Sequence, residues 1–346
     1  MSIVEVTINA SQGAAVSNEP LVVVVDEAAA INWSAAAATF IDEISGTNVV
    51  ASVEGVECAS WEEGSIVQTA GSRHLTLHAQ LPTCADGTVL QLESGAGTTR
   101  SASGVPRTGS HIYAPCQTVS PLNNLGSGAD LTSSNVSQVA GQIAGAAGYN
   151  GTSSQSIGEK PACASGFGIS AWLYYAAAPY RTQFYNQWGM GGAGKASWVL
   201  QAWNYNLGFA VHDGSSTYDV GAIADARDYV GEWIHIAAIY DATNGRTEAW
   251  LNGESTGANE GAVCQTSTLY DVTLGRQASG GNFYGGYLDQ VVMLVGDWWT
   301  EAEVQMHFRN EGANDAFWND PVAVGARYPA TLLHQTGRRG GIFIAN

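Results

Sequence analysis

The chain has 346 residues, of which 42 are glycine, 11 are tryptophan and only 13% are charged. Its 31 acidic and 13 basic side chains give a formal net charge of −18, which repels phosphate backbones and anionic lipid headgroups and argues against nucleic-acid or membrane partners. The length suggests two domains, and a weakly charged, Gly- and Trp-rich composition is typical of a β protein at an extracellular or virion surface.

The first region, residues 1–95, alternates apolar and polar residues and predicts an N-terminal β-sandwich. An Ala-rich stretch over residues 28–39 favours a short helix between strands. His74 and His78 fall in an expected strand, where side chains four residues apart stand roughly 13 Å from each other. We therefore do not expect these two imidazoles to share a metal ion.

Residues 96–121 change to Gly, Ser, Thr and Pro with little periodicity. That composition is typical of a linker, so the boundary between the domains is expected there.

Neither a membrane span nor a signal peptide is evident in the sequence. No stretch reaches about 18 apolar residues, and the first residues run directly into an alternating pattern. We expect either that a leader was removed or that the protein leaves its cell by another route, such as lysis. The cysteines are too widely spaced for zinc ligation and are expected to be buried thiols: Cys58, Cys84, Cys116, Cys163 and Cys264.

The second region, residues 122–312, has the stronger β pattern. Residues 233–240 are apolar on both faces, which predicts a central strand of a packed sandwich with His235 as a hydrogen-bonded core histidine. Thr300 and Glu303 form a capping box that opens one helix ending at about Arg309. The predicted fold class is all-β, with two β-sandwich (jelly-roll) domains in tandem, one short helix near 301–309 and an irregular C-terminal tail.

The tail, residues 313–346, differs in charge from the rest of the chain. From residue 321 onward it contains three arginines and no acidic residue, a charge of +3, so the total of −18 leaves −21 for the rest. A basic segment with an apolar end on an acidic body suggests a docking arm; a frayed terminus is the alternative. The residues expected to dock are Arg327, Arg338, Arg339 and Phe343.

Several motifs resemble those of laminin-G-like, concanavalin-A-like jelly-roll domains over about residues 140–310. They are Gly166-Phe-Gly-Ile-Ser-Ala-Trp172, Gly231-Glu-Trp-Ile-His-Ile-Ala-Ala-Ile-Tyr240, Ala249-Trp-Leu-Asn-Gly-Glu254, Leu274-Gly-Arg276 and Gly285-Gly-Tyr-Leu-Asp289. The resemblance implies two antiparallel sheets. The first region resembles a β-sandwich that often precedes such domains in bacterial surface proteins and in accessory proteins of phage virions.

Hydrolases of this jelly-roll type share a Glu-x-Asp-x-x-Glu strand motif, which this sequence lacks. Its adjacent acidic pairs, such as Asp26-Glu27 and Asp42-Glu43, point to opposite faces of a strand and do not converge on one bond. We therefore expect no enzymatic activity.

Many relatives of this family bind Ca²⁺ through two aspartates at the rim of the sandwich. Asp289 matches one of these positions, but Asn150 stands at the other, so the site loses one formal charge. The expectation is no cofactor, with a weak Ca²⁺ site at Asn150 and Asp289 as the alternative.

Aromatic residues crowd the stretch from Tyr185 to Tyr205. Sugar rings stack on exposed aromatic faces, and Tyr185 and Trp188, with the neighbouring Asn186, are predicted to form a glycan-binding surface. Trp198 and Trp203 are predicted to lie in the core, because jelly rolls pack large aromatic side chains between their sheets.

These observations predict a non-enzymatic structural protein of a virion surface, such as a head decoration or a tail-associated fibre, with a role in glycan binding or host adhesion. Its expected partners are other virion proteins or copies of itself in a homo-oligomer, together with surface glycans. A secreted or cell-surface carbohydrate-binding module is the first alternative. A polysaccharide-degrading enzyme on the same fold is the second.

Overall fold

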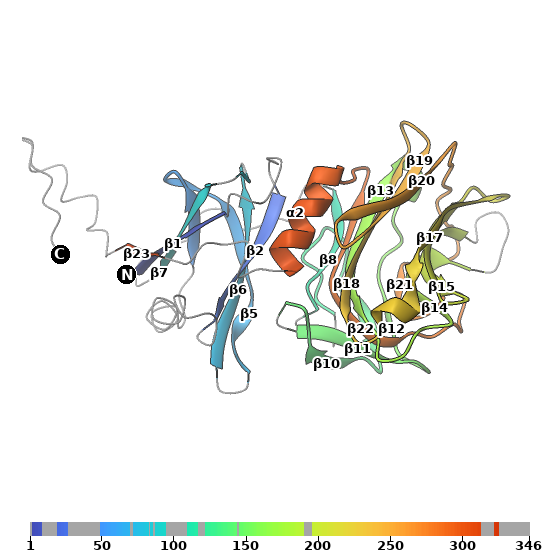
Figure 1. The fold of residues 1–346 in the computed structure, drawn as a ribbon, viewed down its shortest axis with the longest axis horizontal. Helices are drawn as coiled ribbons and strands as arrows, with labels where there is room; N and C mark the ends of the chain where they lie inside the picture. The colour runs from blue at the N-terminus through green and yellow to red at the C-terminus, as the bar shows by residue number, and fades with distance from the viewer. Residues whose placement is uncertain are drawn as a thin grey trace, which may run out of the picture.

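The computed structural model describes residues 2–8, 19–26, 49–69, 72–82, 84–85, 87–94, 109–116, 122–143, 145–189, 196–312 and 322–324. Two β bodies lie along the long axis of the molecule, and helix α2 (Glu301–Gly312) lies between them (Figure 1). Of the helices in the described part of the chain, none is long and apolar enough to cross a bilayer.

The N-terminal body consists of two antiparallel sheets. One has the strand order β23-β1-β7-β3-β4 and the other β2-β6-β5. Their bounds are β1 (Ser2–Thr7), β2 (Glu19–Asp26), β3 (Val50–Val53), β4 (Val56–Glu57), β5 (Ala59–Thr69), β6 (Ser72–Leu81), β7 (Val89–Ser94) and β23 (Val322–Val324). Apolar side chains such as Val6, Leu77 and Leu92 form its core. His74 and His78 lie in β6, so the predicted strand is confirmed there; the expected helix over 28–39 lies outside the described residues.

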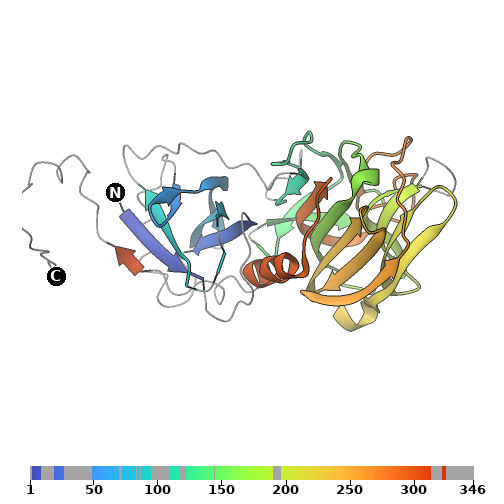
Figure 2. The same ribbon diagram turned by 90° about the horizontal axis from the view of Figure 1, so that it is seen from above.

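Part of the predicted irregular tail is a strand. β23 pairs antiparallel with β1, with Ile3 opposite Val324, so the chain returns to the first sandwich after α2 (Figure 2). The four residues of the expected docking arm, Arg327, Arg338, Arg339 and Phe343, lie outside the described residues.

The C-terminal body is a larger sandwich of two antiparallel sheets. The first has the order β10-β11-β22-β13-β18-β19-β20, with β8 also pairing β22, and the second has the order β17-β16-β15-β14-β21-β12-β9. The first sheet comprises β8 (Ser110–Ala114), β10 (Ser137–Ala140), β11 (Gly145–Asn150), β13 (Phe167–Tyr174), β18 (Trp233–Asp241), β19 (Arg246–Leu251), β20 (Glu254–Glu260) and β22 (Gly285–Val295). The second comprises β9 (Thr132–Ser134), β12 (Gln155–Ile157), β14 (Arg181–Trp188), β15 (Ala196–Trp203), β16 (Asn206–His212), β17 (Thr217–Asp225) and β21 (Thr273–Leu274). The remaining described elements are two short 3-10 helices, η1 (Cys163–Ser165) and η2 (Ala226–Tyr229).

The expected linker over 96–121 is shorter than its composition suggested. β8 lies within it and pairs with β22, because its apolar residues Ile112 and Ala114 join the core of the second sandwich. The Gly- and Ser-rich composition therefore does not extend the linker through this part of the segment.

β18 is a central strand, as its two apolar faces predicted, and lies between β13 and β19. Ile236 and Ala238 face the main core, whereas Ala237 and Ile239 contribute to a second apolar cluster with residues of the α2 segment. The prediction for His235 is also confirmed, because it is buried and its Nε2 lies 2.9 Å from Ser170 Oγ. The five cysteines are buried, in agreement with the prediction of buried thiols.

Helix α2 begins at the predicted capping box and joins the two bodies. The backbone N–H of Thr300 donates to Glu303 Oε2 at 2.6 Å, and that of Glu303 donates to Thr300 Oγ1 at 3.4 Å. Met306 packs into the core of the first sandwich, while Val304 joins the outer apolar cluster of the second. The helix ends at Gly312, three residues beyond the predicted end.

A buried polar cluster holds the end of α2 against β13 and β18. The indole N–H of Trp172 donates to Glu311 Oε2 at 2.6 Å, and His307 Nδ1 lies 3.6 Å from Glu311 Oε1. Phe308 stacks on Trp172, which also contacts His235. Transferring a carboxylate from water into the protein interior is costly. The hydrogen bond from Trp172 and the contact with His307 offset this cost for Glu311.

We expect the stability of the chain to fall as the pH falls below about 6.5. Burial lowers the pKa of His235 to about 4, so the unfolded chain binds a proton there before the folded chain does. Burial raises the pKa of Glu311, but the hydrogen bond and charge of His307, the charge of His235 and the Trp172 N–H outweigh it and hold that pKa below its usual value. Stabilisation by Glu311 is therefore present above pH ~4.5 and lost as the pH falls through its folded pKa.

Thermal melts between pH 7.5 and pH 4 test this expectation. The temperature at the midpoint of unfolding should fall as the pH is lowered. The variant His235→Gln removes the titrating imidazole and should flatten the profile between pH ~6.5 and ~4. A midpoint that is constant or rises on acidification would contradict it.

Candidate functional site

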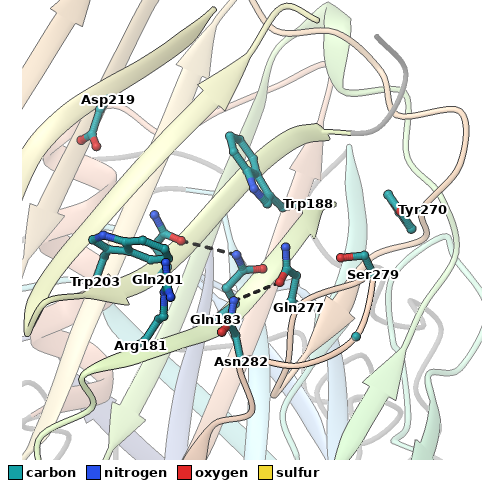
Figure 3. Close-up of a pocket in the computed structure, with 11 residues that line it drawn as sticks. Arg181, Gln183, Trp188, Gln201, Trp203, Asp219, Tyr270, Gln277, Ser279 and Asn282 are labelled. Carbon is teal, nitrogen blue, oxygen red and sulfur yellow. Dashed lines mark hydrogen bonds between the residues drawn. The ribbon is translucent and has the colours of Figure 1, made fainter. Parts of the chain in front are cut away.

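A cavity of about 840 Å³ opens on the outer face of the β14–β17 part of the second sheet (Figure 3). This volume lies within the range of roughly 300–1,000 Å³ that is typical of ligand pockets. The strands contribute Arg181, Gln183, Trp188, Gln201, Trp203 and Asp219. The segment that precedes β22 contributes Tyr270, Gln277, Ser279, Gly280 and Asn282.

The register of β14 and β15 explains why polar residues line this face. Arg181 pairs with Trp203 and Gln183 with Gln201, and residues directly opposite each other share one face of a sheet. The residues of β15 that alternate with Gln201 and Trp203, namely Leu200 and Ala202, lie in the core. The outer face therefore carries Arg, Gln and Trp side chains where the inner face is apolar.

Trp203 is the most exposed aromatic group in the cavity. Its side chain is 42% exposed, and the guanidinium carbon of Arg181 lies 3.5 Å from the centroid of its ring. The sequence prediction that Trp203 belongs to the core is wrong. Trp198 takes that place and is fully buried.

The side chain of Gln183 is 3% exposed, and its Nε2 donates to Gln201 Oε1 at 3.4 Å (Figure 3). Its Oε1 is buried and accepts no hydrogen bond. An unpaired buried acceptor costs about 1–3 kcal/mol.

The loop that carries Asn282 is tied to β14. The backbone N–H of Gln183 donates to Asn282 O at 3.1 Å, and Asn282 Nδ2 donates to Gln277 Oε1 at 2.9 Å. This loop lies about a hundred residues beyond β14 in the sequence, and no local sequence pattern indicated that the two meet.

The structure separates the three residues predicted to bind a glycan. Trp188 is half-buried and lines the cavity, with its ring edge-on to His212 at 5.5 Å between centroids. Tyr185 is fully buried, with its ring edge-on to that of Trp198 at 4.9 Å. The prediction that Tyr185 is exposed is therefore wrong, and it does not contribute to a surface.

Asn186 supports the wall of the cavity. Its side chain is fully buried; Nδ2 donates to Arg276 O at 2.7 Å and Oδ1 accepts from the N–H groups of Ala278 and Trp188, each at 3.1 Å. These bonds fix the loop that contributes Gln277 and Ser279. Asn186 is a positioning residue for that loop and is too buried to touch a ligand.

Bulges in β14 explain why Tyr185 turns inward. The register with β15 shifts between Gln183 and Tyr185, so that Tyr185 lies opposite the core residue Leu200. Without this shift Tyr185 would share the face of Gln183, since alternate residues of a strand point the same way.

Asp219 is the one carboxylate among the described residues that line the cavity. Its Oδ1 accepts from the N–H of Gly221 at 2.6 Å, and burial raises its pKa. Glycoside hydrolysis ordinarily requires two carboxyl groups on either side of the scissile bond. The lining therefore offers hydrogen-bond acceptors and donors for binding, and no acid pair.

The two residues proposed for calcium lie apart. Asn150 pairs with Gly285, four positions before Asp289 on β22, and four residues of a strand span roughly 13 Å. Asn150 Oδ1 accepts from the N–H of Ser153 at 2.9 Å, and Asp289 Oδ2 accepts from that of Ile143 at 2.8 Å. Within the described part of the chain, no group of three or more His, Cys, Asp or Glu side chains is placed to hold a metal ion.

A second cavity, of about 690 Å³, lies on the first sandwich. Its lining combines apolar side chains such as Val56 and Val89 with the carboxylates of Glu5 and Glu54. Gln91 Nε2 already donates to Glu5 Oε1 at 2.6 Å. None of the described lining residues is aromatic, so this cavity lacks a platform for a sugar ring.

Comparisons with known proteins identify the second sandwich. Residues 148–305 match a laminin G family model described as the concanavalin A-like lectin/glucanases superfamily. The predicted jelly roll is thereby confirmed over these residues. A search of curated protein sequences finds no match.

Solved structures with a similar fold include two binding domains and one domain of an arabinanase. The binding domain of Paraclostridial Mosquitocidal Protein 1 is 15% identical, with 57% of this chain and 51% of that one covered and a TM-score of 0.46. Domain 4 of AbnA, a GH43 extracellular arabinanase from Geobacillus stearothermophilus, in complex with arabinotriose, is 20% identical, with 51% and 82% covered and a TM-score of 0.40. The binding domain of botulinum neurotoxin DC in complex with SialylT is 11% identical, with 59% and 52% covered and a TM-score of 0.45.

The match to the first of these structures spans about half of its length.

Proposed function

From the premise that residues 148–305 form a concanavalin A-like jelly-roll domain, we propose that the chain is a non-enzymatic, glycan-binding surface protein. Its binding site is the cavity on the outer face of β14–β17. The fold alone does not select this function, because the same architecture hosts several.

One observation carries the proposal: the cavity places the exposed ring of Trp203 beside the accessible side-chain amides of Gln201 and Asn282. A sugar ring has apolar C–H faces that pack on an indole and hydroxyls that both donate and accept hydrogen bonds. Gln201, Gln277 and Asn282 surround the same space with amide groups. A largely pre-formed pocket with a few converging polar groups is the usual form of a small-ligand site.

The proposal of a binding protein rather than an enzyme rests on the charges of the cavity. Asp219 is the single carboxylate among its described lining residues, whereas acid and nucleophile, or acid and base, are both needed for the usual hydrolysis of glycosides.

We expect the purified chain to bind at least one class of oligosaccharide on a glycan array, with no release of reducing sugar from the glycans that it binds. Adding a chelator should leave binding unchanged, because Asn150 and Asp289 lie apart and away from the cavity lining. An array with no bound glycan would refute the proposed function, and release of reducing sugar would restore the enzyme alternative.

Attachment to a virion remains a prediction. The docking arm, which is one of the features that suggested it, lies outside the described residues. Glycan binding in the cavity fits a protein exposed on a virion or on a cell.

A further inference from the structure

The binding cavity contains a cation in a chain that has few of them. Only 13 of the 346 residues are Lys or Arg, against 31 Asp or Glu. Two other described arginines are paired with carboxylates: Arg227 with Asp225, and Arg246 with Glu248 and Glu260. Arg181 has no carboxylate within ion-pair distance in the described part of the chain and lies instead over Trp203.

The position of Arg181 leaves its donors available to a ligand. A guanidinium carries five N–H donors directed outward in its plane, so a stack against an indole occupies a face of the group and not its edge. Arg181 is exposed, and Figure 3 shows it with Trp203 at one end of the cavity. Two parallel N–H groups of a guanidinium match the two oxygens of a carboxylate.

Asp219 gives the cavity a direction. Figure 3 shows its carboxylate apart from Arg181, beyond Trp203. A negative group on the ligand would be repelled at Asp219 and attracted at Arg181, whereas a sugar hydroxyl can donate to Asp219. The two charged residues thereby favour one orientation of a ligand that carries a single negative charge.

We propose that this site, if it binds glycans as inferred above, selects a sugar that bears a carboxylate, with the carboxylate on Arg181, the ring against Trp203 and a hydroxyl on the side-chain amide of Gln201. The overall charge of −18 disfavours highly charged ligands such as phosphorylated or polysulfated glycans. One carboxylate within an otherwise neutral oligosaccharide is the anion that a single unpaired arginine compensates.

The test uses oligosaccharides that carry one uronic or sialic acid, each in three forms: the free acid, its methyl ester and the corresponding neutral sugar. The methyl ester keeps the ring and its linkages and removes only the charge. Isothermal titration is expected to show the full-length chain binding the free acid about tenfold more tightly than the ester. Raising the salt concentration should reduce this preference.

Two variants assign the preference to Arg181. Arg181→Gln should remove the preference for the free acid while the ester and neutral sugar still bind, and Arg181→Lys should keep part of it, since the charge remains but the two-pronged geometry is lost. Retained binding of the neutral sugar shows that the variant site is folded.

The outcomes separate this inference from the proposed function. If the wild-type chain binds neutral sugars or esters as tightly as free acids, or if Arg181→Gln keeps the preference, selection of acidic sugars is wrong while glycan binding stands. If the chain binds no form of any sugar, both are wrong.

Discussion

Replacing Trp203 with alanine should weaken glycan binding by about thirtyfold or more. Truncating an aromatic group on which a ligand packs commonly costs 2 kcal/mol or more, and 1.4 kcal/mol corresponds to a factor of ten in affinity. The indole is 42% exposed in the free protein, so its removal should change the free energy of unfolding by less than about 1 kcal/mol, most of it the lost contact with Arg181.

The second sandwich supplies a matched control for this variant. Trp233 packs with Tyr174 and Tyr287 on the other sheet, with ring centroids 5.5 and 6.4 Å away. Trp233→Ala removes an equally large side chain outside the cavity and should leave glycan affinity unchanged. If Trp233→Ala abolishes binding and Trp203→Ala does not, the site has been assigned to the wrong sheet.

Gly275→Ala is expected to destabilise the second sandwich by about 3 kcal/mol. Gly275 has φ +79, and a Cβ there would lie 2.1 Å from Cδ1 of Tyr149. The ring of Tyr149 is buried and its hydroxyl lies 3.1 Å from Ser156 Oγ, so it has little room to move away. A left-handed backbone costs a side chain roughly 1–2 kcal/mol, and overpacking a core costs a further 1–3 kcal/mol.

Gly231→Ala separates these two contributions. Gly231 also has a positive φ, +85, but a Cβ there meets no atom within 4 Å, so only the backbone cost of about 1 kcal/mol is expected. Urea-induced unfolding followed by tryptophan fluorescence measures both variants. Equal losses of stability at the two positions would show that Tyr149 yields readily, contrary to the expectation.

The predictions that depended on local patterns agree with the structure. The capping box of Thr300 and Glu303 marks the start of α2, because its two hydrogen bonds form between residues three apart. The apolar residues at successive positions of 233–240 identified β18 as a central strand. A strand that is buried on both faces lacks the alternating polar residues of a half-exposed strand.

The exposure of Trp203 could have been predicted from the alternation of residues along its strand. Trp198 and Trp203 are five positions apart in β15, so in a regular strand they point to opposite faces and only one can lie in the core. The general preference of jelly rolls for buried aromatic residues outweighed this alternation in the prediction. Arg181 and Gln183 are two positions apart in β14 and lie on the same face of the sheet, as this alternation predicts.

Two features of the site depend on non-local structure. Because of the bulges in β14, the side chain of Tyr185 points to the opposite face of the sheet from that of Gln183. The bulges are shifts in the pairing register with β15, and no local sequence pattern in β14 indicated them. The loop containing Gln277 and Asn282 reaches β14 through bonds such as that from Gln183 N to Asn282 O. Contacts over such separations follow from the complete fold, so Gln183 and Asn282 carried no signal in the sequence.

A crystal structure of the chain with its tightest-binding oligosaccharide tests the central claim most directly. The account predicts a sugar ring packed against Trp203, with a hydroxyl within hydrogen-bonding distance of the side-chain amide of Gln201. A sugar bound on the first sandwich, or beside Tyr174, Trp233 and Tyr287, with the cavity of β14–β17 left empty, would contradict it.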